Sequence, residues 1–149
     1  MLKINKLADY GLMVMSCLAH RPQALNAREI TAATHLKLPT VSKVLKALTK
    51  AGLLTSLRGS QGGYSLARPA EYISLSSMLE ALEGDMSIVE CAQQSGMCQV
   101  EHFCGIRHNW RFINQLFQQT LNEVSLADML KPTPYLQKKL GQEHHVNSN

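Results

Sequence analysis

Residues 26–51 read NAREITAATHLKLPTVSKVLKALTKA, and this stretch decides the fold. Its first part predicts a helix over about 26–36, because Asn26 followed by Glu29 has the form of a capping box. Its second part predicts a helix over about 40–51, whose apolar residues share one face: Val41, Val44, Leu45 and Leu48. Two helices joined by a turn of about three or four residues are the pattern of a helix-turn-helix.

The segments on either side of this pair complete a winged helix-turn-helix. A helix is predicted over about 5–20, where apolar residues recur at helical spacing. After the pair, residues 53–57 and 64–67 alternate as short strands around a glycine-rich turn. We therefore expect a mainly α fold with a two-stranded wing.

The C-terminal half predicts two further helices separated by an irregular segment. Ser74 caps a helix that stops at Gly84, and no clear periodicity follows over 85–104. A longer helix is predicted over about 105–123, with a broad apolar stripe formed by Trp110, Ile113, Leu116, Phe117, Leu121 and Val124. Because a small chain has little else to cover this stripe, we expect a second copy to pack there, making a homodimer.

The chain length of 149 residues suits one compact unit with four regions. We assign 1–70 to the winged helix-turn-helix, 71–104 to a linker helix and a cysteine-bearing loop, 105–130 to the dimerisation helix and a short final helix begun by Ser125, and 131–149 to a disordered tail. The longest apolar run near the start, residues 11–19, is too short to span a bilayer, so we expect no membrane segment and a cytoplasmic location.

Charge is divided unevenly along the chain. Residues 1–70 contain ten Lys and Arg against two acidic residues, a formal +8, whereas residues 71–149 contain five against nine, a formal −4. Clustered cations are what phosphate neutralisation requires, so this division favours a nucleic-acid reader joined to a sensing or pairing region.

The expected DNA contacts lie on the second helix of the pair and in the wing. Base-edge contacts are expected from Thr40, Ser42 and Lys43, and phosphate or minor-groove contacts from Lys46, Lys50 and Arg58. Gly62, in the turn of the wing, would let the backbone approach a phosphate closely. The expected partner is a double-stranded DNA operator.

Three of the four cysteines fall in the irregular segment. Cys91, Cys98 and Cys104 are spaced too widely and irregularly for a zinc knuckle or a thioredoxin-type pair. Thiolates are preferred ligands of iron-sulfur clusters, and spacing alone leaves a cluster, another metal and plain thiols open. Cys17 is predicted to be a small buried residue of the first helix.

Several motifs together resemble the IscR/NsrR/RirA family of winged-helix regulators over about residues 1–130. They are LADYGL at 7–12, Leu53-Leu54, Arg58-Gly59, GGYSLARP at 62–69 and the three cysteines. Glu83-Gly84, Glu90-Cys91, Trp110 and VSLADM at 124–129 are most similar to the branch that regulates SUF iron-sulfur assembly. The resemblance implies a bacterial, homodimeric repressor whose operator affinity follows the state of an iron-sulfur cluster, [2Fe-2S] or [4Fe-4S].

The same resemblance implies that Cys91, Cys98 and Cys104 are cluster ligands, although six residues separate the first two where IscR has five. IscR-type members place a histidine where this chain has Arg107, which is a poor ligand. NsrR-type members use an aspartate of the partner's first helix, and Asp9 stands at that position. We favour Asp9 as the fourth ligand, with His108 as the alternative. A glutamate that adjusts sequence choice in IscR is Ser42 here.

Two other interpretations stay open at this stage. A winged-helix repressor could respond to thiol oxidation, nitric oxide or zinc without a stable cluster. A redox enzyme is disfavoured, because the sequence has no dinucleotide fingerprint, no phosphate loop and no acid-base pair around a pocket. We therefore expect a regulator with no small-molecule substrate.

Overall fold

A computed structural model describes residues 4–141 of the chain. Its helices are α1 (Lys6–Ala19), α2 (Ala27–Thr34), α3 (Leu38–Lys50), α4 (Leu75–Glu83), α5 (Glu90–Gln93), α6 (Arg107–Glu123), α7 (Leu126–Met129) and α8 (Thr133–Lys139). Strands β1 (Leu54–Leu57) and β2 (Gly63–Leu66) form an antiparallel pair, and the short 3-10 helices are η1 (Ala70–Tyr72) and η2 (Glu101–Phe103). The fold is mainly helical with a two-stranded sheet, as predicted.

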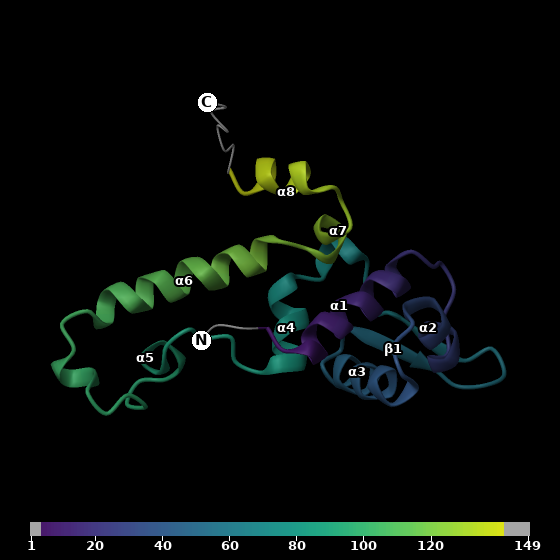
Figure 1. The fold of residues 1–149 in the computed structure, drawn as a ribbon, viewed down its shortest axis with the longest axis horizontal. Coiled ribbons are helices and arrows are strands. Elements are labelled where there is room, and N and C mark those ends of the chain that lie inside the picture. The colour runs from purple at the N-terminus through teal and green to yellow at the C-terminus, as the bar shows by residue number, and fades with distance from the viewer. Residues whose placement is uncertain (1–3, 142–149) are drawn as a thin grey trace.

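Helix α1 occupies the centre of the N-terminal body and contacts α2, α3 and α4 (Figure 1). Its N-cap, Asn5, accepts a hydrogen bond from the N–H of Ala8 and is tied to Glu83 at the end of α4, whose carboxylate lies 2.5 Å from the backbone nitrogen of Asn5. Gly11 lets α4 approach closely, since a Cβ at that position would lie 2.2 Å from the Leu82 side chain. Most of the buried apolar residues gather around this helix.

Helix caps set the bounds of the helix-turn-helix. The capping box of Asn26 and Glu29 is present at the start of α2, as predicted. Helix α2 ends earlier than expected, because His35 adopts a left-handed conformation with φ of 57°. Helix α3 begins at Leu38, two residues before the predicted start, because Pro39 fits the first turn of a helix.

Helix α6 extends away from the N-terminal body, and α5 lies beside its far end (Figure 1). The near end is fixed where the chain returns to the body: the N–H of Leu75 donates to Val124 O at 2.7 Å and the N–H of Leu126 donates to Ile73 O at 2.8 Å. A long helix is present here, starting at Arg107 instead of 105, and its role in dimerisation stays a prediction. Its predicted stripe is largely uncovered in the single chain, where Trp110, Ile113 and Leu116 are 40, 45 and 48% exposed.

Two segments expected to be irregular contain short helices, and the expectation of a disordered tail was wrong over 133–139. Residues 85–104, predicted to lack clear periodicity, contain the short α5 and η2 joined by irregular chain. The tail predicted to be disordered over 131–149 contains α8, which Lys139 ties to the buried carboxylate of Asp128. The remainder of that tail, from 142 on, lies outside the described residues. Both segments are organised by charged pairs, which hydrophobic periodicity does not register.

Candidate DNA-binding surface and cysteine loop

Helix α3 separates its apolar and polar residues as the sequence predicts. Val41, Val44, Leu45 and Leu48 are buried against the core. Ser42, Lys43, Lys46 and Lys50 are exposed. Thr40 is half-buried in a shallow pocket that it lines with Tyr10 and Lys43, so it is less accessible than the other candidates.

The wing is a hairpin of two four-residue strands with an exposed turn. Leu54 pairs with Leu66 and Leu57 with Gly63, and Arg58 begins the turn as an exposed cation. A Cβ on Gly62 would lie 2.4 Å from the carbonyl oxygen of Leu57. Gly62 is therefore required by the turn itself, a steric reason distinct from the phosphate contact predicted for it.

Among the residues that the structure describes, the cations of this surface have no acidic partners. Within residues 4–141, the ion pairs involve Glu101 and Asp128 and lie in the C-terminal half of the chain. The lysines of α3 and Arg58 thus remain available to neutralise phosphates.

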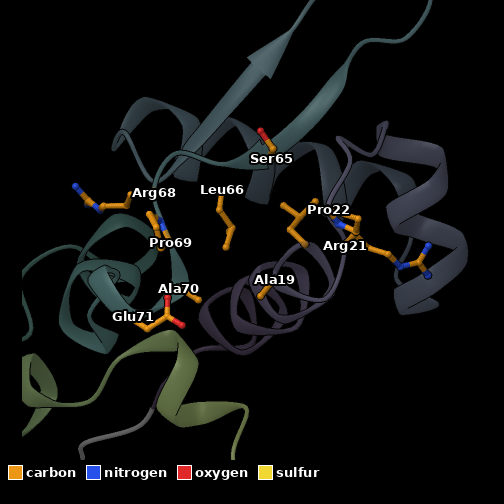
Figure 2. Close-up of a pocket in the computed structure, with 10 residues that line it drawn as sticks. Ala19, Arg21, Pro22, Ser65, Leu66, Arg68, Pro69, Ala70 and Glu71 are labelled. Carbon is orange, nitrogen blue, oxygen red and sulfur yellow. The ribbon is translucent and has the colours of Figure 1, made fainter.

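A further pocket of about 350 Å³ lies behind the wing, between the end of α1, strand β2 and η1 (Figure 2). Arg21 and Arg68 border it, but Figure 2 shows both guanidinium groups directed away from its centre, which Ala19 and Leu66 line. Polar groups do not converge there, and we assign it no role.

The three cysteines of the C-terminal half lie along one segment. Cys91 is in α5, Cys98 follows it in the loop and Cys104 is the residue directly after η2; all three are half-buried free thiols. Within the part of the chain that the structure describes, no three His, Cys, Asp or Glu side chains are placed to hold a metal ion. Asp9 and His108, the two candidates for a fourth ligand, are exposed on α1 and α6. Cys17 is half-buried and packs against the core.

A buried carboxylate organises this segment, and sequence reasoning missed it. Glu101 is 2% exposed, and its side chain accepts hydrogen bonds from the N–H of Gly96 at 2.5 Å, the hydroxyl of Ser95 at 3.2 Å and Nη2 of Arg111 at 2.5 Å. The Gly96 N–H first, then Ser95 and the guanidinium groups, hold the pKa of Glu101 below its usual range despite the opposing effect of burial.

Two residues of α6 complete the attachment. Arg111 Nε donates to the carbonyl oxygen of Cys91 at 3.0 Å, and the buried side chain of Asn114 accepts from the N–H of Ile88 at 2.9 Å. Arg107, which stands where IscR-type members have a histidine, has its Nη1 3.9 Å from Glu101 Oε1. In the sequence, this attachment is indicated only by Arg111 and Asn114, a charged and an amide residue beside the apolar stripe of the predicted helix.

The chain has a helix-turn-helix with a basic second helix, followed by a hairpin wing with glycines in its turn. These features define a winged helix-turn-helix protein of the DNA-binding class. Residues 4–132 match the Rrf2 family, described as iron-dependent transcriptional regulators. The chain belongs to this family. It is therefore a DNA-binding transcriptional regulator. Members of this family are transcriptional regulators and not enzymes.

Individual relatives cover nearly the whole chain. The HTH-type transcriptional regulator NsrR of Oceanobacillus iheyensis is 28% identical over 145 residues, covering 95% of this chain and 99% of that protein. Among solved structures, CymR, the global cysteine regulator of B. subtilis, is similar with a TM-score of 0.67 and 28% identity, covering 87% of this chain and 96% of its own. IscR of T. potens gives a TM-score of 0.64 and 28% identity, covering 87 and 86%.

These relatives differ in what their names say they regulate, so the predicted SUF branch stays a prediction. Among the described helices, none combines the length and apolar character that crossing a membrane requires.

Proposed function

We propose that this chain is a homodimeric repressor whose operator affinity is controlled by an iron-sulfur cluster on Cys91, Cys98 and Cys104, and that it regulates SUF cluster-assembly genes. The observation that carries the proposal is the set of three half-buried, unbridged thiols on one segment attached to α6. Unbridged thiols are the donors that iron-sulfur clusters take.

The dimer part of the proposal is supported by the uncovered face of α6. Trp110, Ile113 and Leu116 lie along one side of the helix and are each at least 40% exposed. An apolar stripe of this size is unfavourable in water, and a second α6 across a two-fold axis would cover it. Two helix-turn-helix units related by such an axis would match the two half-sites of a palindromic operator.

The donor set fits a cluster in kind, but the segment must close before the three thiols can meet, since they do not converge in the described residues. A bound cluster would supply an oxidation-sensitive bridge among the three cysteines. For the fourth position we favour Asp9, exposed on α1 and therefore open to a partner's segment, over His108 on α6. Closure of the cysteine segment can change the affinity for DNA only if the closed and open forms place the two helix-turn-helix units of the dimer differently.

The test is the visible absorption spectrum, with iron and sulfide content, of protein purified without oxygen. Wild type should be coloured and contain both elements, Cys98→Ala should lose both, and Cys17→Ala should retain them as a matched control. Colourless wild-type protein, after attempted reconstitution as well, would contradict the cluster proposal. Binding of SUF promoter DNA by the loaded and the cluster-free protein tests the regulatory part.

A second candidate is a repressor that responds to thiol oxidation, nitric oxide or zinc with no stable cluster. The unassembled cysteines and the similarity to CymR favour it. It predicts colourless protein whose operator affinity changes on treatment with a thiol oxidant, with a nitric oxide donor or with zinc.

A further inference from the structure

The backbone of each cysteine in the segment is joined to the Glu101–Arg111 pair. Arg111 Nε donates to Cys91 O at 3.0 Å. The N–H of Glu101 donates to Cys98 O at 3.1 Å, and the N–H of Cys104 lies 3.5 Å from Glu101 O. The Arg111 guanidinium therefore contacts the backbone of Cys91, and the main chain of Glu101 contacts the backbones of Cys98 and Cys104 in the turn that the Glu101 carboxylate holds on α6.

The pair also holds the segment on the helix whose apolar face is uncovered. Glu101 belongs to η2 and Arg111 to the second turn of α6, and their side chains approach to 2.5 Å. A buried carboxylate is costly unless it is charge-paired and hydrogen-bonded, and Glu101 obtains its bonds from Gly96 and Ser95 as well as from α6. Because separation of the pair would leave the Glu101 carboxylate buried without a partner, the pair holds the segment on α6.

Arg107 supports the same arrangement. Its guanidinium Nη1 is 3.9 Å from the Glu101 carboxylate, and its N–H donates to Cys104 O at 3.4 Å. The position that carries a histidine in IscR-type members thus faces the carboxylate here. This side chain belongs to the Glu101 cluster and is unsuited to binding a metal.

We propose that Glu101 and Arg111 are positioning residues that fix the backbones of Cys91, Cys98 and Cys104 on α6, so that any rearrangement of the cysteines is passed directly to that helix. The role of the cysteines as ligands rests on the proposed function, whereas the contacts of Glu101 and Arg111 with the segment do not. Within residues 4–141, the hydrogen bonds of these two side chains go to other atoms than the cysteine sulfurs, so each acts through the geometry of the cysteine backbone.

The first measurement uses full-length, metal-free protein. Glu101→Gln removes the charge at constant size, and Arg111→Lys keeps a charge but cannot donate to both Cys91 O and Glu101 as the guanidinium does. Glu123→Gln, at the exposed end of α6, is the control. Both test variants should speed amide hydrogen exchange over 91–104 by roughly tenfold or more, the size expected for losing a charged hydrogen bond, while Glu123→Gln matches wild type.

A second readout separates positioning from a general loss of stability. Site-resolved alkylation should change the relative reactivities of Cys91, Cys98 and Cys104 in the variants, measured against Cys17 in the same molecule. After reconstitution with iron and sulfide, the visible circular dichroism of the variants should also differ from that of wild type. If Glu101→Gln does not fold, the exchange and alkylation of the milder Arg111→Lys variant test the positioning role.

Unchanged exchange over 91–104 in Arg111→Lys would overturn the proposal, as would faster exchange with unaltered relative thiol reactivity. If wild type takes up no cluster, the proposed function fails. The exchange and alkylation results still decide whether Glu101 and Arg111 position the cysteine backbones.

Discussion

Tyr64 in the wing exchanges two backbone hydrogen bonds with Leu25, the residue just before the N-cap of α2. The N–H of Tyr64 donates to Leu25 O at 2.8 Å, and the N–H of Leu25 donates to Tyr64 O at 3.0 Å. The wing is therefore joined to the helix-turn-helix by main-chain bonds, which fix its position relative to α3. Gly63, next in the strand, permits this approach, since a Cβ there would lie 2.6 Å from Leu25 O.

Gly63→Ala should therefore damage both folding and DNA binding. The added methyl group meets backbone atoms that cannot move aside as a flexible side chain can, so we expect a loss of about 1–3 kcal/mol in the free energy of unfolding. Urea titration measures this loss, and fluorescence anisotropy with an operator duplex measures the weaker binding. Gly105→Ala, where a Cβ meets no atom within 4 Å, should leave the unfolding free energy nearly unchanged. Equal stability of the two variants would refute the argument.

Arg58→Ala should weaken operator binding by removing an exposed cation at the turn of the wing that forms no ion pair within residues 4–141. Each phosphate contact contributes about 0.9 to the slope of log affinity against log salt concentration, so the slope should fall by about one unit. Lys138→Ala, on α8, is the control and should leave the slope unchanged. A wild-type slope in Arg58→Ala would remove this residue from the interface.

Leu116→Glu should dissociate the proposed dimer, because it places a charge in the apolar stripe of α6. We expect the dimer dissociation constant to rise roughly 30-fold or more, as for a central interface residue. Sedimentation velocity over a range of concentrations measures it. Asn122→Glu introduces the same charge at an exposed position off the stripe and should leave the dimer intact. A monomeric wild type, or a dimeric Leu116→Glu, would show that this face is not the interface.

Local signals in the sequence predicted most of the fold, because helix caps and apolar periodicity act over a few residues. Asn26, Ser74 and Ser125 each cap the helix expected from the sequence. The attachment of the cysteine segment could not be predicted in this way. Glu101 is of a type that is almost never fully buried, and its partner Arg111 is ten positions away across an irregular stretch. Its burial follows from tertiary pairing alone.

The same reasoning accounts for the unexpected α8. Asp128 caps α7 together with Ser125, whose N–H donates to the Asp128 carboxylate at 2.9 Å, and it also receives the ammonium group of Lys139. The side chain is nearly inaccessible, at 3% exposure. Burial raises the pKa of Asp128, but the hydrogen bonds from Lys139 and Ser125 outweigh it and hold this pKa well below the usual value of 3.8.

Asp128→Asn should therefore lower stability near neutral pH and have little effect in acid. A carboxyl whose pKa is depressed on folding contributes its full stability above the unfolded pKa, near 3.8, and loses it progressively as the pH falls below that value toward the folded pKa. We expect the variant to lose about 1–3 kcal/mol at pH 7 relative to wild type, with the difference shrinking from pH 5 to pH 3. Urea titrations across this range measure it, with Glu123→Gln as the exposed control. A difference that stays constant down to pH 3 would show that the ionised carboxylate is not what holds α8 in place.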